Sequence, residues 1–128
     1  MINDPIADLL TRFRNGYLAR LAVVSIPYSG LKEKIVQILE KNAYIVSYTV
    51  SEDKREIIVK LNDVRKTKYL PSFRRISRPG QRIYIKATDV RKSRNGQGIY
   101  ILSTPKGVIT GYEAYSLKTC GELLCEIY

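Results

Sequence analysis

The spacing of apolar residues changes along this chain, and that change constrains the fold more than any other feature. In the two segments that follow Asp4 and Ser29, apolar side chains recur three or four residues apart, which is the period of an amphipathic helix. From Phe73 onward they alternate with polar side chains, which is the period of a half-buried strand. Helices and strands mixed in the first half, followed by a mostly strand-forming second half, predict an α+β fold. We expect two small lobes, an N-terminal α-β-α-β-β lobe over residues 1–64 and a mostly antiparallel β lobe over residues 65–128.

Two helices are predicted in the N-terminal lobe. Asp4 can cap a helix that opens with Pro5 and ends near Gly16. Ser29 can cap a second helix, which Asn42 can end. Extended segments are expected over residues 22–27, 44–50 and 56–61.

The C-terminal lobe is predicted to open with a β-hairpin. Residues 73–77 and 82–86 flank Arg78-Pro79-Gly80-Gln81, where Pro at the second position and Gly at the third suit a type II turn. Further strands are expected over residues 99–104, 108–109 and 123–128, with turns at Asn95-Gly96 and Pro105-Lys106-Gly107.

The charge balance predicts a polyanionic partner. The chain has 22 Lys and Arg against 12 Asp and Glu, and the net charge of +10 suits nucleic acid or an acidic membrane surface. Residues 65–128 hold thirteen basic and four acidic side chains, whereas residues 1–64 hold nine and eight. We therefore expect the N-terminal half to be mainly structural and the C-terminal half to face the polyanion.

Several function classes are unsupported by the residues present. The chain has no His, which removes the usual general base and the commonest neutral metal ligand. It has no glycine-rich phosphate loop, and the spacing of Cys120 and Cys125 fits two small packed hydrophobes better than a redox pair or a zinc site. Its apolar runs are too short for a membrane-spanning helix, and the N-terminus does not resemble a signal peptide. We expect no enzyme activity, cofactor, metal, membrane contact or small-molecule substrate.

Four arginines lie on or beside the predicted hairpin: Arg74, Arg75, Arg78 and Arg82. Their guanidinium groups can pair with phosphate oxygens and stack on bases. Charged side chains on an exposed strand can also serve only to discourage unwanted strand pairing. A second basic run, residues 91–94, suits either a binding loop or a solvated one.

An apolar strand delivers two hydroxyls, Ser103 and Thr104, to a turn that also holds Lys106 and Gly107. Hydroxyls that donate and accept hydrogen bonds can contact a ribose 2′-OH, a base edge or a phosphate, and Gly107 would allow a close backbone approach. The alternative is an ordinary Ser/Thr turn with local hydrogen bonds. The residues alone leave both interpretations open.

Four segments spread over nearly the whole chain carry a family resemblance. The Ser103-Thr104-x-x-Gly107 turn, with apolar pairs on both sides, resembles the signature of the small-subunit ribosomal protein eight family. Residues 4–16 resemble the opening of that family, residues 76–84 its central hairpin and residues 121–125 its ending, all in the family order.

The resemblance implies a two-lobed protein that binds the central domain of small-subunit ribosomal RNA directly and helps its assembly. It also implies neighbouring small-subunit proteins, such as proteins five and twelve, as partners. The implied location is the ribosome, in a bacterial cytoplasm or in an organelle. A free-standing regulator that binds a messenger RNA ranks second, and an enzyme acting on RNA ranks third. The implied RNA contacts, with two arginines added from the basic cluster, are Ser103, Thr104, Lys106, Tyr84, Glu122, Arg12, Arg14, Lys32, Arg78 and Arg82.

Some of these positions admit more than one role or depart from the family pattern. Glu122 is interpreted as an acceptor for base or ribose donors, and Tyr84 as either a base-stacking ring or a core residue. Pro105 stands where the family commonly has Ser, which removes one hydroxyl and one backbone N–H from the turn. Gly30 likewise replaces a frequent Lys, and Cys120 a Gly.

Overall fold

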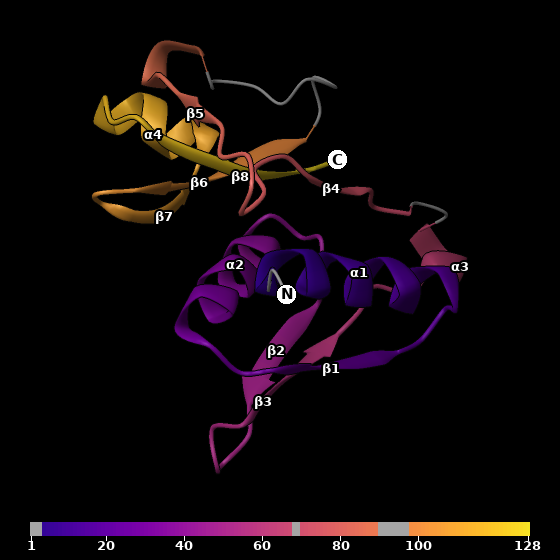
Figure 1. Cartoon of the computed structure of the whole chain (residues 1–128). Coiled ribbons are helices and arrows are strands. Elements are labelled where there is room, and N and C mark those ends of the chain that lie inside the picture. The colour runs from indigo at the N-terminus through magenta and orange to yellow at the C-terminus, as the bar shows by residue number, and fades with distance from the viewer. Residues whose placement is uncertain (1–3, 68–69, 90–97) are drawn as a thin grey trace. The chain divides into compact units, whose positions relative to one another are not determined.

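A computed structural model describes residues 4–67, 70–89 and 98–128, and the chain divides into two compact units (Figure 1). The N-terminal unit comprises residues 8–71. The C-terminal unit comprises residues 72–128 together with the N-terminal residues up to Ala7. Each unit contains one antiparallel sheet, so the predicted α+β class is confirmed.

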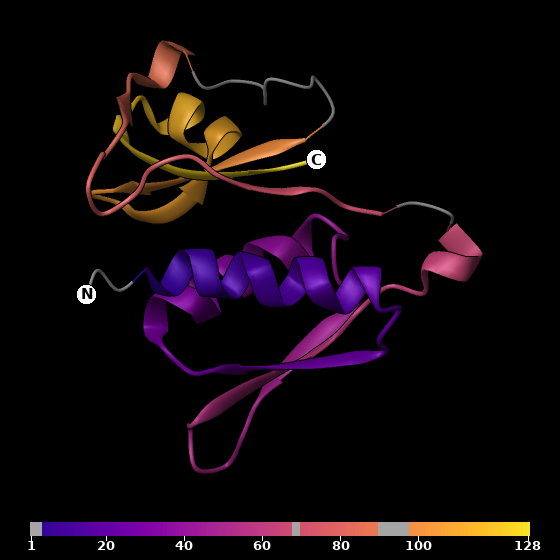
Figure 2. The same ribbon diagram turned by 45° about the vertical axis from the view of Figure 1, so that its right-hand side comes forward.

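The N-terminal unit has the predicted α-β-α-β-β order. Its elements are α1 (Pro5–Leu18), β1 (Val23–Pro27), α2 (Gly30–Lys41), β2 (Ser47–Val50), β3 (Glu56–Lys60) and the four-residue α3 (Val64–Thr67), which was not predicted. The sheet order is β1-β3-β2, and α1 and α2 lie on the same side of it in both views (Figure 1, Figure 2). Strands β1 and β3 bury alternate residues because only one face of the sheet is covered.

The predicted helix caps are confirmed, but the predicted end of α1 is wrong. The Ser29 hydroxyl accepts a hydrogen bond from the Lys32 backbone N–H at 3.2 Å, and Asn42 is the C-cap of α2. Gly16 lies inside α1, which continues to Leu18. A Cβ on Gly16 would lie 2.6 Å from Cγ2 of Val24, so this glycine serves the close approach of β1 rather than the helix end.

The C-terminal unit is mostly antiparallel sheet, as predicted. Its elements are β4 (Phe73–Arg75), β5 (Tyr84–Ile85), the 3₁₀ turn η1 (Ala87–Asp89), β6 (Ile99–Thr104), β7 (Gly107–Thr110), α4 (Gly111–Leu117) and β8 (Gly121–Ile127). The strand order is β4-β8-β6-β7, and β5 also pairs with β8. Helix α4 packs over this sheet, and the core between them contains Leu102, Ile109, Ala114 and Leu123.

The predicted hairpin between residues 73–77 and 82–86 is wrong. Strand β4 pairs with one stretch of β8 and strand β5 with another, so the two short strands share a partner and do not pair with each other. Between the two segments, Arg78 and Gln81 form a single backbone bridge, with N···O distances of 3.0 and 2.9 Å. The buried Ser77 hydroxyl accepts from the Ile83 N–H at 2.8 Å, which replaces a backbone ladder at that point.

Two further turn predictions have different outcomes. Gly80 lacks the positive φ that a type II turn requires, so that turn type is wrong. Pro105 and Lys106 form the predicted turn between β6 and β7, which ends at Gly107 with φ of 110°. The basic run at residues 91–94 and the turn predicted at Asn95-Gly96 lie outside the described residues.

Candidate nucleic-acid interface

Three of the expected contact residues lie in one row across the C-terminal sheet. Tyr84 on β5 is in register with Glu122 on β8, and Glu122 is in register with Ser103 on β6. Residues in register on neighbouring strands project from the same face of a sheet. The next residues along two of the strands, Leu102 and Leu123, belong to the core under α4. We call the three residues Tyr84, Glu122 and Ser103 the contact row; it lies on the face opposite that core.

Tyr84 presents an aromatic ring to solvent. Its exposed fraction is 68%, whereas the following residue, Ile85, packs against the core. The interpretation of Tyr84 as a core residue is therefore wrong. An exposed ring on a rigid strand is a surface on which an unpaired base can stack.

Glu122 is held by an arginine of the predicted cluster. The Arg82 guanidinium donates to Oε1 of Glu122 at 3.1 Å, and the side-chain exposed fractions are 56% for Arg82 and 11% for Glu122. The pair neutralises a nearly buried carboxylate, and Oε2 remains an acceptor. Since guanidinium has five N–H donors, Arg82 can still donate to a phosphate.

The hydroxyls of Ser103 and Thr104, at the β6–β7 turn, differ in their hydrogen-bond partners. The Thr104 hydroxyl donates to the Gly107 carbonyl at 2.9 Å and accepts from the Lys106 backbone N–H at 3.1 Å. Thr104 therefore forms the local turn that was the alternative interpretation. The Ser103 hydroxyl has no hydrogen-bond partner within the described structure, so it is available to a ligand.

Lys106 connects the turn to α4. Its Nζ donates to the Leu117 carbonyl at 3.2 Å, at the C-terminal end of α4, where the partial negative charge of a helix favours a cation. An ammonium group has three N–H donors, so two remain for a phosphate. The ammonium group of Lys106 therefore lies at the end of α4 and keeps donors that its helix contact does not use.

Gly121 is a part of this site that sequence reasoning did not single out. A Cβ on Gly121 would lie 2.3 Å from the Ser103 carbonyl oxygen and 2.7 Å from Cγ2 of Thr104. No side chain fits there, and the glycine lets β8 approach the turn-bearing end of β6. A glycine just before an apolar strand is the signal that could have identified it.

Most of the predicted arginine cluster is ion-paired within the C-terminal unit. The pairs are Arg74 with Glu126 at 3.4 Å, Arg75 with Asp4 at 3.1 Å and Arg82 with Glu122 at 3.1 Å. The Arg78 side chain is exposed and has no partner within the described structure. Arg74 and Arg75 therefore act mainly in the sheet, and Arg78 and Arg82 are the arginines that can reach a ligand.

The remaining expected contacts lie in the N-terminal unit. Arg12 on α1 pairs with Asp8 at 3.0 Å and also donates to the Ser25 carbonyl at 3.3 Å. Arg14 on α1 is exposed, whereas Lys32 on α2 has an exposed fraction of only 6%. The structure thus brings together the contact row and the turn, and it places these three cations in a separate unit.

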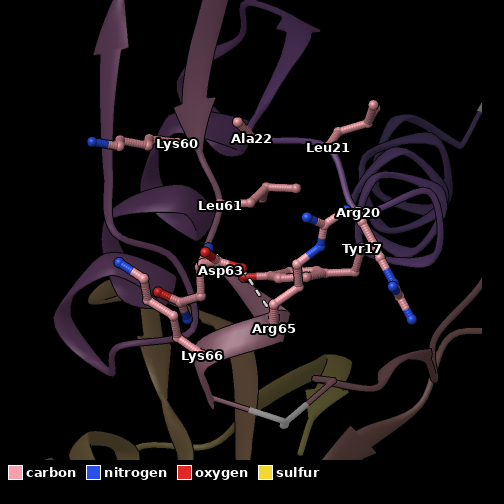
Figure 3. A pocket seen from close by; sticks show the side chains of 10 residues that line it. Tyr17, Arg20, Leu21, Ala22, Lys60, Leu61, Asp63, Arg65 and Lys66 are labelled. Carbon is pink, nitrogen blue, oxygen red and sulfur yellow. Dashed lines mark hydrogen bonds between the residues drawn. The ribbon is translucent and has the colours of Figure 1, made fainter.

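The same unit contains a cavity of about 490 Å³ that the sequence did not predict (Figure 3). It is lined by Tyr17, Arg20, Leu21, Ala22, Lys60, Leu61, Asn62, Asp63, Arg65 and Lys66. The adjacent cations Arg65 and Lys66 were a visible signal, but the boundary assumed at residue 64 assigned them to the other lobe.

The two thiols have different environments. Burial raises the pKa of Cys125 to about 12, an effect that nearby Arg75 only partly opposes, so this thiol stays protonated and inert. Cys120 is exposed, which corrects the expectation that both cysteines are packed. In the part of the chain that the structure describes, no cluster of His, Cys, Asp or Glu could hold a metal ion. No helix in that part is long and apolar enough to cross a membrane.

Comparison with known proteins extends the sequence resemblance over the full chain. The family model for ribosomal protein S8 matches residues 4–128. The small ribosomal subunit protein uS8 of Persephonella marina is 46% identical over 136 residues, covering 100% of both chains. The uS8 of Roseiflexus castenholzii is 45% identical, covering 99% of this chain and 98% of its own. The protein uS8c of Tetradesmus obliquus is 39% identical, covering 100% of both.

These matches confirm the expected resemblance, and they concern a family of ribosomal structural proteins rather than of enzymes. They also give the ribosome as the location of the chain. The chain belongs to the ribosomal protein S8 family of the small ribosomal subunit.

Proposed function

We propose that this chain binds the central domain of small-subunit ribosomal RNA directly and helps that RNA to assemble. The observation that carries the proposal is the contact row, in which the ring of Tyr84, the carboxylate of Glu122 and the hydroxyl of Ser103 lie in register on three strands. A stacking surface, an acceptor and a hydroxyl that can donate or accept are the groups that read an unpaired nucleotide.

The chemistry of the row favours folded RNA with exposed bases over a regular duplex. The major groove of an A-form helix is too deep and narrow for side chains to read, so specific contacts fall on bases that are unstacked from a helix. A base on Tyr84 would present its edge to Oε2 of Glu122 and its ribose to the Ser103 hydroxyl. Arg82 and Lys106 would then pair with the flanking phosphates.

The contact row also favours a structural role for the chain over a catalytic one. The contact row holds one nearly buried carboxylate paired with Arg82, which suits an acceptor better than a general base. We also propose contacts with neighbouring small-subunit proteins, including proteins five and twelve, on the strength of the family resemblance.

The test is a comparison of affinities at one salt concentration. The full chain is titrated with a fragment that spans the central domain of small-subunit ribosomal RNA, and with fragments of equal length from other domains. Site-specific recognition predicts a preference of about a thousandfold or more for the central domain, as in specific nucleic-acid complexes generally. Equal affinity for all fragments would reduce the interaction to charge attraction and would overturn the proposal.

A further inference from the structure

The excess positive charge is divided equally between the two structural units. Residues 8–71 hold twelve Lys and Arg against seven Asp and Glu, and the remaining residues hold ten against five. Each unit therefore carries an excess of five positive charges. This count removes the asymmetry from which a mainly structural N-terminal half was expected, because the N-terminal unit extends past residue 64 to residue 71.

Much of this charge lines the cavity of the N-terminal unit. The cavity, of about 490 Å³, is formed by the C-terminal end of α1, the end of β3 and helix α3. Four of its lining residues are basic, namely Arg20, Lys60, Arg65 and Lys66, and one, Asp63, is acidic. We call these four basic residues the cavity cations.

The cavity cations are not neutralised within the described structure. All four are exposed, and none of their side chains has an ion pair or a hydrogen bond there. The one carboxylate nearby, Asp63, accepts a hydrogen bond from the Arg65 backbone N–H at 3.0 Å and so caps α3. This contrasts with the arginine cluster of the C-terminal unit, where three of four side chains pair with carboxylates.

The floor of the cavity is fixed by hydrogen bonds. The buried Tyr17 hydroxyl donates to the Tyr44 carbonyl and accepts from the Asn62 backbone N–H at 3.3 Å. The Asn62 side chain in turn donates to the Ala43 carbonyl at 3.1 Å. Figure 3 shows the Tyr17 side chain in the middle, with Lys60 and Lys66 on one side of it and Arg20 on the other. A hydrogen-bonded floor with exposed cations around it, unpaired within the described residues, is suited to an anion.

We propose that this cavity binds a phosphate group, and that the group belongs to the RNA backbone. The first part depends only on the cavity: guanidinium and ammonium groups without carboxylate partners match phosphate oxygens in charge and geometry. The apolar wall of Leu21, Ala22 and Leu61 would lie against the sugar. The second part rests on the RNA-binding function proposed above. The alternative ligand with the same phosphate group is free inorganic phosphate.

The experiment compares two triple variants of the full chain that lose the same charge from the same unit. The cavity variant is Lys60→Gln, Arg65→Gln, Lys66→Gln. The control is Lys34→Gln, Lys41→Gln, Lys54→Gln, whose positions are exposed and do not line the cavity. Thermal melting establishes that both variants fold. If the triple cavity variant does not fold, the single variant Arg65→Gln takes its place in the comparison.

Affinity for the central-domain RNA is measured for each variant over a range of salt concentrations. The cavity variant should lose at least about tenfold in affinity relative to the control, and its salt slope should fall by about one phosphate equivalent. Equal losses in both variants, while the wild-type chain still prefers the central domain, would overturn this inference and leave the proposed function intact.

Inorganic phosphate distinguishes the two sources. Titrating it into the full chain should shift the backbone amide resonances of Leu61 and Asn62, and the cavity variant should abolish those shifts while the control retains them. Loss of the phosphate shifts without loss of RNA affinity would assign the cavity to free phosphate and overturn its RNA role. The absence of shifts together with unchanged RNA binding would overturn the site itself.

Discussion

Ser103 and Thr104 are chain neighbours with different tasks. The Thr104 hydroxyl is used within the turn, through hydrogen bonds to the Gly107 carbonyl and the Lys106 backbone N–H. Ser103 belongs to the contact row and keeps its hydroxyl open. At the scale of single residues, the proposed recognition would use hydroxyl and aromatic groups that have no hydrogen-bond partner within the described structure.

Tyr84 should contribute by stacking, which is testable with a second exposed tyrosine of the same unit. Tyr84→Leu removes the ring from the contact row and should weaken binding to the cognate RNA by about 1 to 3 kcal/mol. Tyr115→Leu removes a ring that is 43% exposed on α4 and should leave affinity nearly unchanged. Filter binding or fluorescence anisotropy measures both. Equal effects of the two variants would argue against stacking at Tyr84.

Gly121 should tolerate no side chain. In Gly121→Ala the new Cβ would meet the Ser103 backbone at 2.3 Å, so β8 and β6 must separate, at a cost of about 1 to 3 kcal/mol in the free energy of unfolding. RNA affinity should fall with it, because the contact row crosses these strands.

The control for this variant is Gly30→Ala at the start of α2, where a Cβ would meet nothing within 4 Å. Helix propensity there should leave stability unchanged or raise it by up to about 1 kcal/mol. Urea unfolding measures both changes, and a Gly121→Ala variant as stable as the wild type would contradict the close-approach argument.

At the scale of elements, caps and apolar periodicity predicted the two long helices, because their signals are local. The end residues of α2, Ser29 and Asn42, act as predicted. The hairpin prediction was wrong because strand pairing is not local. The seven-residue strand β8 pairs with both β4 and β5 along one edge. Helix α4 was missed although Thr110 and Glu113, three residues apart, form the cap that such spacing indicates.

The candidate site was predictable to a similar degree. The family motif identified Tyr84, Glu122 and Ser103, which lie far apart in sequence, but not that they form one row. That arrangement depends on the register of β5, β8 and β6, which no single segment encodes. The cavity of the N-terminal unit was not predicted for a related reason, since its lining comes from the ends of three elements.

The end of α1 offers a prediction at this scale. Arg20 follows the helix with a left-handed φ of 56°, and the Leu21 N–H donates to the Gly16 carbonyl at 2.9 Å, a helix end that favours glycine. Arg20→Gly should raise the free energy of unfolding by about 0.5 to 1 kcal/mol by relieving this conformation. Because Arg20 is also a cavity cation, the same variant should bind phosphate more weakly. A lower melting temperature would contradict the assignment of Arg20 as the strained residue.

At the scale of the whole molecule, two units with equal excess charge should give a strongly salt-dependent interaction with RNA. If the chain contacts about five phosphates, a plot of log affinity against log salt concentration should be linear with a slope on the order of −4. Isothermal titration or filter binding between about 50 and 200 mM salt measures the slope. A slope near zero would remove the electrostatic part of the account.

Charge attraction alone would bind any RNA, so in the proposed function the contact row supplies the discrimination between RNAs. Ser103→Ala removes one hydroxyl without changing charge, and Ser72→Ala removes another exposed hydroxyl at the far end of the same sheet, where Ser72 pairs with Tyr128. Because neither variant changes the charge, and both lose one hydroxyl, a difference between their RNA affinities would report on recognition by Ser103 itself.

The most direct test is the affinity of these two variants for the central-domain RNA and for an unrelated duplex of equal length. Ser103→Ala should lose about 1 to 3 kcal/mol on the central domain only, with an unchanged salt slope, and Ser72→Ala should behave as the wild type on both RNAs. If Ser103→Ala binds the central domain as tightly as Ser72→Ala, or weakens on both RNAs alike, the contact row is not where this protein reads RNA.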